Sequence, residues 1–226
     1  MKPHFIPKVV LKQFSSANDD SVVVLNKSEM TYRRRGIGHS TFTLSSNYYG
    51  NGKAGTLENE LASNDESSIT TIINLIRSGQ DIDPFKFELK FFLWNNSARN
   101  PAFRDHPKVG KLPQLSSENF HRSAMDSIKD EYLLDGIVVA HLRNNLNKLL
   151  LPDFSLQYAV LAPDVAIIRV SSGETEKVKS FIFEDEDRFV QGLNIQSMQS
   201  AKNWVVANSE EPLEMLGATK LDSCTK

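Results

Sequence analysis

The segment SLQYAVLAPDVAIIRV holds two short apolar runs that are separated only by Ala162-Pro163-Asp164. Proline and aspartate are typical turn residues, so the pattern predicts two strands joined by a tight turn. A chain with this segment has to build a sheet in its C-terminal third. KVKSFIFED predicts one more strand there, and RFVQGLNIQSMQSAKNWVVANS predicts a helix that carries Ile195, Met198 and Trp204.

Strand patterns also occur near the N-terminus. SVVVLNK predicts a strand, and MTYRRRGIG and HSTFTLSSNYYG predict its partners in a small antiparallel sheet. Ahead of them, Pro7 suits the first turn of a short helix that continues to Phe14.

The middle of the chain has helical periodicity instead. From Thr56 to a stop near Gly79, apolar residues share one helical stripe that comprises Leu61, Ile69, Ile72 and Ile76. A second helix opens at Pro84 and places on one face Phe85, Leu89 and Phe92. After a proline-rich connection, SSENFHRSAMDSIKDEYLLDGIVVAHLRNNLNKLLL predicts one or two further helices, with His141 at the edge of the core.

This order of strands, helices and again strands with a helix predicts the α+β class. We expect an N-terminal small antiparallel sheet, a helical middle, and C-terminal strands and a helix in one compact domain over residues 1–216. Residues 217–226 are expected to be a frayed tail. The C-terminal strands should join or abut the first sheet, and the N-terminal segment should pack near the acidic helix.

Composition limits the function classes. The apolar share of 40% is enough for a core, while the net charge of −2 argues against a bulk surface that grips nucleic acid. No apolar run is long enough to span a bilayer, and no secretory signal pattern is present. With Cys224 as the single cysteine, an internal disulfide and a cysteine-based zinc site are excluded. We therefore expect a cytoplasmic protein without a membrane partner.

One group of polar residues conflicts with the helical pattern. Asp65 falls on the apolar stripe, and Glu58 lies two turns earlier on nearly the same face. A charge that faces a core is costly unless it is paired, so we expect Asp65 or Glu58 to meet Arg99 or His4. His4, Glu58, Asp65 or Glu66, and Arg99 could hold a divalent metal and a phosphate, as in a phosphodiesterase. The other interpretation is a structural network of buried ion pairs.

A second group is TYRRRGIGH. In a strand, Arg33 and Arg35 would share one face and Arg34 would lie on the other. These arginines could contact nucleic-acid phosphates, or they could be the solvated cations of an edge strand. The segment RNPAFRDH also resembles the catalytic signature of HEPN-type ribonucleases, although Pro101 interrupts it.

The opening HFIPKVVLKQF resembles the start of a mostly bacterial family known as domain of unknown function 4238. The resemblance continues in VVVLN, LENELASNDESS, WNNSARNP, YAVLAPDVAII and GLNIQSMQSAKNWVVANSEEPLE. The family usually carries a Ser-Asp-x-Pro step, for which Leu151-Pro152-Asp153 has the wrong order. The resemblance implies no established reaction.

Two function classes follow. The first is a binding or regulatory module of a bacterial accessory system, such as host defence or a mobile element, that acts through a protein partner. The alternative is a metal-dependent phosphodiesterase or nuclease that uses His4, the acidic helix and Arg99, with a divalent metal as cofactor and nucleic acid as substrate. An enzyme needs its polar cluster to open onto a cleft, whereas an interaction protein should expose an apolar patch.

Overall fold

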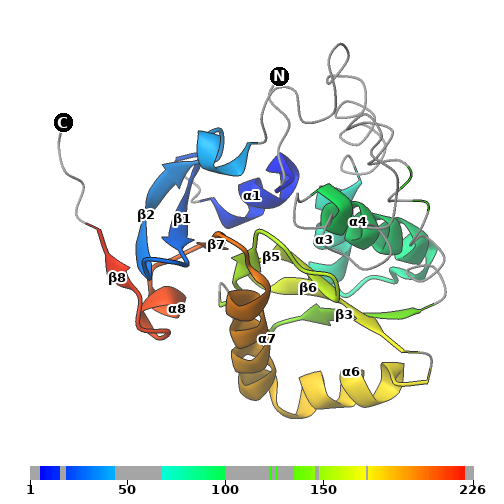
Figure 1. Cartoon of the computed structure of the whole chain (residues 1–226). Coiled ribbons are helices and arrows are strands. Elements are labelled where there is room, and N and C mark those ends of the chain that lie inside the picture. Colours follow the sequence, from blue (N-terminus) through cyan, green and yellow to red (C-terminus); the bar gives the residue numbers. More distant parts are fainter. Residues whose placement is uncertain are drawn as a thin grey trace.

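Figure 1 shows the computed structural model, in which two β-sheets pack with helices around them. The predicted α+β class is confirmed. The structure describes residues 6–15, 19–43, 68–99, 123, 126, 135–145, 148–171 and 173–221.

The first sheet brings together strands from both ends of the chain. Its strand order is β4-β7-β1-β2-β8. The bounds are β1 Ser21–Asn26, β2 Thr31–Gly36, β4 Leu151–Pro152, β7 Trp204–Ala207 and β8 Thr219–Lys220. β1 pairs antiparallel with β2 on one side and with β7 on the other. β8 pairs parallel with β2 and lies within the segment predicted as a tail.

The second sheet has the order β3-β6-β5. β5 (Tyr158–Ala162) and β6 (Val165–Val170) form the predicted antiparallel hairpin. β3 (Gly136–His141) corrects the sequence analysis, which placed GIVVAH in a helix. The β-branched residues of this segment are stiff about χ1 and fit a pleated surface, and all six residues pair with β6.

Three helices from the first half of the chain pack into the main core. They are α1 (Lys8–Phe14), α3 (Ile69–Arg77) and α4 (Lys86–Arg99), the last of which follows the short 3₁₀ helix η3 (Asp83–Phe85). The predicted stripes are confirmed where they are described, because the core includes Ile69, Ile72, Ile76, Leu89 and Phe92. α3 ends before Gly79, whose φ of 68° is the left-handed conformation that glycine allows.

The C-terminal helices differ from the prediction in two places. KVKSFIFED is predicted as a strand but lies in α6 (Thr175–Glu184). Val178 and Ile182, one helical turn apart, face the core, whereas Phe181 and Phe183 are exposed. α7 (Glu186–Ser200) ends before Trp204, which belongs to β7 and not to the predicted helix.

The segment HSTFTLSSNYYG is also corrected in part. Ser40–Phe42 forms the 3₁₀ helix η1, capped by His39, where a strand was expected. The His39 ring accepts a hydrogen bond from the N–H of Thr41, which favours a tight turn over an extended chain. Residues 44–50 of the segment lie outside the described part of the chain.

The central strand β1 is covered on both faces. Val22 and Val24 belong to the main core, which also includes residues of α1 and α3. Val23 and Leu25 belong to a second cluster that includes Leu213 of the one-turn helix α8 (Glu211–Glu214). This second cluster fixes α8 against the sheet and so positions one wall of the site below.

Candidate binding cleft between α7 and α8

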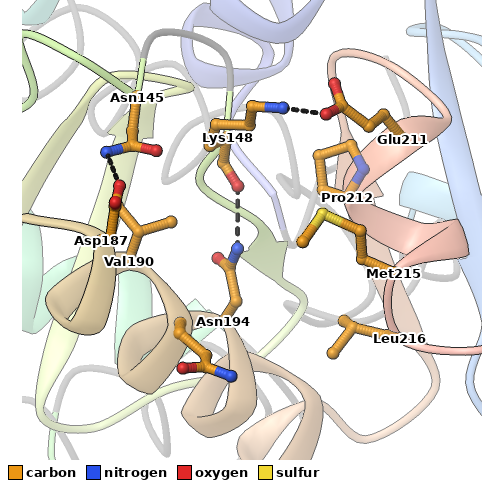
Figure 2. A pocket seen from close by; sticks show the side chains of 10 residues that line it. Asn145, Lys148, Asp187, Val190, Asn194, Glu211, Pro212, Met215 and Leu216 are labelled. Carbon is orange, nitrogen blue, oxygen red and sulfur yellow. Dashed lines mark hydrogen bonds and ion pairs between the residues drawn. The ribbon is translucent and has the colours of Figure 1, made fainter.

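A cleft with a volume of about 470 Å³ lies between α7, α8 and the loop that precedes β4. Figure 2 shows the side chains that line it. They are Asn145, Lys148, Asp187, Val190, Gln191, Asn194, Glu211, Pro212, Met215 and Leu216. The volume lies in the range of ordinary ligand clefts, which extends over about 300–1,000 Å³.

Glu186 holds the first part of the loop. Its carboxylate accepts hydrogen bonds at 2.8–2.9 Å from the backbone N–H groups of Arg143, Asn144 and Asn145. Burial raises the pKa of Glu186, but these bonds and one from the Asn145 side chain outweigh it and leave the pKa below its ordinary value. A charged Glu186 therefore anchors the loop at neutral pH.

Asn194 holds the second part of the loop. Its Nδ2 donates to the carbonyl of Lys148 at 2.8 Å, and its Oδ1 accepts from the N–H of Leu150 at 2.9 Å. Ser197, one helical turn further on, donates to the carbonyl of Leu150. α7 therefore fixes the backbone from which Lys148 reaches into the cleft, as Figure 2 shows.

α8 is held from the sheet below it. The buried Tyr32 of β2 donates its hydroxyl to Glu214 at 2.6 Å and to Glu210 at 3.4 Å. The bond to Glu214 is the main cause that raises the pKa of Tyr32, so the phenol keeps its proton. Lys220 of β8 pairs with Glu210 and is the main cause that lowers the pKa of Glu210. Gly217, with a φ of 81°, then turns the chain from α8 towards β8.

The lining combines apolar groups with charges. Val190, Pro212, Met215 and Leu216 supply the apolar part, and Met215 is 78% exposed. Lys148 forms an ion pair with Glu211 across the cleft, and Asp187 accepts a hydrogen bond from Asn145. The ten described lining residues include no histidine, serine or cysteine, and their charged groups are Lys148, Asp187 and Glu211.

The predicted catalytic residues lie elsewhere. His4, Glu58, Asp65 and Glu66 are outside the described part of the chain. Arg99 ends α4, and its side chain is not among those described. Residues 100–106 of the ribonuclease-like segment are also outside the described part of the chain. Within the described ranges, no group of three or more histidine, cysteine, aspartate or glutamate side chains is placed to hold a metal ion.

The three predicted arginines lie on β2, and none of them lines this cleft. Arg33 lies opposite Val24 and Arg35 opposite Val22, so both share the face of the main core. Arg34 lies on the other face, where its charge contributes to lowering the pKa of Glu210. The alternation expected from the sequence is therefore present.

Sequence reasoning missed the carboxylates that organise the site and its surroundings. In the acidic run FEDEDRF, Asp185 caps α7 and Glu186 accepts hydrogen bonds from the loop amides. Asp153 of the segment Leu151-Pro152-Asp153 accepts three backbone N–H groups, from residues 202–204. Aspartate before a helical pattern was a usable signal for the cap. The other two roles depend on contacts between segments far apart in the chain.

Comparisons with known proteins identify a family and nothing closer. The sequence model of a family described as "Protein of unknown function (DUF4238)" matches residues 2–157. Searches of the curated proteins and of the solved structures each returned no significant match. The described helices include none that is both long enough and apolar enough to cross a membrane.

Proposed function

The chain belongs to the DUF4238 family, whose function is unknown, and we propose that it is a binding module that acts through a protein partner. An apolar and basic segment of that partner lies in the cleft between α7 and α8. The observation that carries this proposal is the exposed Met215 at the rim of a cleft with a charged lining. Methionine is flexible and polarisable, and it is frequent on surfaces that bind peptides.

The shape of the cleft accommodates a short chain segment. Asp187, Val190, Gln191 and Asn194 follow one stripe of α7 over two helical turns. At 1.5 Å per residue this stripe is roughly 10 Å long, which matches about three residues of extended peptide.

The charges favour a basic segment. The lining carries two carboxylates, Asp187 and Glu211, against the single ammonium of Lys148. Asp185 and Glu186 lie at the start of α7, and Glu210 and Glu214 lie at the two ends of α8. Electrostatic complementarity of this kind selects partners and speeds their association.

The alternative function, a metal-dependent phosphodiesterase or nuclease, rests on residues outside the described part of the chain and stays a prediction. The setting in a bacterial accessory system stays a prediction too. Neither enters the argument for the cleft.

A random-peptide phage library tests the proposal. Selection against the wild-type protein should enrich peptides that combine lysine or arginine with large apolar residues. A synthetic peptide from that selection should bind Met215→Glu about fivefold or more weakly, since loss of an apolar anchor costs about 1 kcal/mol or more. Calorimetric titration measures both affinities.

Phe183→Glu is the matched control, because Phe183 is an exposed apolar residue of α6 that does not line the cleft. It should bind the peptide as the wild type does. The proposal fails if no basic and apolar peptides are enriched, or if Met215→Glu binds them with unchanged affinity.

A further inference from the structure

β2 presents two arginines on one face of the first sheet, apart from the proposed cleft. Arg33 is exposed and Arg35 half-buried, and each lies opposite a valine of β1 that belongs to the main core. Side chains two residues apart in a strand are separated by about 6.6–6.8 Å. This is close to the spacing of successive phosphates along one strand of nucleic acid.

His39 adds a third group beside them. Its Nδ1 accepts a hydrogen bond from the N–H of Thr41 at 3.1 Å. In the neutral ring the proton therefore sits on Nε2, which is a donor. The N–H of His39 donates to the carbonyl of Gly36, the last residue of β2, at 2.9 Å, so a tight turn keeps His39 beside the end of this strand. Burial, then the charges of Arg35 and Arg33, lower the pKa of His39.

These positive charges lack a counterion in the described part of the chain. No ion pair and no side-chain hydrogen bond joins Arg33 or Arg35 to another described residue. Burial, followed by the charge of Arg33, lowers the pKa of Arg35, so the two cations repel each other. An anion placed between them would relieve this repulsion.

The surface next to the arginines has room for such an anion. Gly38 is exposed, and a Cβ atom added there would meet nothing within 4 Å. Ser40 is exposed as well, at the start of η1. Ile37 between them is buried, so this stretch offers no apolar side chain to insert into a bilayer.

We propose that Arg33, Arg35 and His39 form a binding surface for the backbone phosphates of single-stranded nucleic acid. The contacts reach phosphates only, so binding is independent of base sequence and sensitive to salt. A chain with a net charge of −2 can bind in this way because the positive groups are concentrated on one face of β2.

Fluorescence anisotropy with labelled oligo(dT) tests this surface. The double variant Arg33→Ala/Arg35→Ala should weaken binding about a hundredfold or more, since it removes two charged hydrogen bonds to phosphates. The slope of log affinity against log salt should become shallower by about 1.4, because each lost phosphate contact on a single strand removes about 0.7.

Arg34→Ala is the matched control, because this arginine is exposed on the same strand but on the opposite face, near Glu210. It should retain wild-type affinity for oligo(dT). Met215→Glu should retain it as well, which would show that oligo(dT) does not bind in the peptide cleft. Circular dichroism melts check that each variant is folded.

Three results would overturn the inference. One is absence of oligo(dT) binding by the wild type at about 50 mM salt. Another is an equal loss in Arg34→Ala. The third is binding to vesicles that contain phosphatidylserine, dependent on Arg33 and Arg35, without binding to oligo(dT).

Discussion

At the scale of single residues, carboxylates that accept backbone N–H groups do most of the positioning around the cleft. Glu186 fixes residues 143–145, and Asp153 fixes residues 202–204. Burial, the larger effect, raises the pKa of Asp153 against the three hydrogen bonds that lower it. For Glu186 the bonds prevail, and its pKa is lowered. The balance differs because Asp153 is buried, whereas Glu186 is partly exposed.

Glu186→Gln tests the anchor through its pH dependence. A lowered folded-state pKa means that the ionised carboxylate stabilises the protein above the ordinary value of 4.5, and that this stability is lost as the pH falls through the folded-state pKa. At pH 7 we expect a loss of about 1 kcal/mol in the free energy of unfolding, at the low end because the group is partly exposed. Urea denaturation at several pH values measures it.

The difference between Glu186→Gln and wild type should shrink at the acidic end of the series. Glu184→Gln, on the exposed last turn of α6, should have no effect at any pH. A loss that is equally large in acid would show that the carboxylate charge does not anchor the loop.

At the scale of elements, α8 is a single turn and is held by tertiary contacts. Tyr32→Phe removes the hydroxyl that donates to Glu214 and Glu210, so we expect faster amide hydrogen exchange in α8 than in the wild type. Tyr158→Phe is the control, because its hydroxyl bonds Ser197 and Ser200 of α7. If Tyr32→Phe leaves the exchange in α8 unchanged, Tyr32 does not hold this wall of the cleft.

Elements with local signals were predictable from the sequence. The turn residues between β5 and β6, the stripe of α3 and the opening of α4 depend on neighbours in the chain, and the structure confirms them. The strand β3 was predicted as a helix, and the helix α6 was predicted as a strand. Tertiary contacts determine the secondary structure of both segments. β3 is a strand because β6 pairs along its whole length. α6 is a helix because Val178 and Ile182, one helical turn apart, pack on the core.

The site was less predictable than the fold. The alternation of Arg33, Arg34 and Arg35 follows from the strand alone, so the sequence could place them. The cleft joins α7 and α8 to a loop that lies about forty residues before α7 in the chain. No periodicity in the sequence reports that contact.

At the scale of the whole molecule, strands from the C-terminal part complete the first sheet, which the N-terminal strands begin. The family match ends at residue 157, and β5, β6, α6, α7, β7, α8 and β8 lie beyond it. β7 nevertheless pairs with the central strand β1, and β8 pairs with β2. Removal of the residues after 157 should therefore expose β1 and prevent stable folding.

The metal-dependent alternative also has a whole-molecule test. We predict that Mg²⁺, Mn²⁺ or Zn²⁺ raises the melting temperature of the wild type, and not of Asp65→Ala, if Asp65 binds a metal. If no metal shifts the wild type and Asp65→Ala melts far lower, the residue belongs to a structural ion pair and the nuclease alternative is dropped.

The proposed function places a partner segment in the cleft between α7 and α8. Methyl NMR of protein labelled at its five methionines tests this directly. The Met215 resonance is assigned through Met215→Leu, and a phage-selected peptide is then added to saturation. We predict that the Met215 methyl signal shifts on binding, in the wild type and in Phe183→Glu alike. A peptide that saturates the protein while the Met215 signal stays in place would contradict the account.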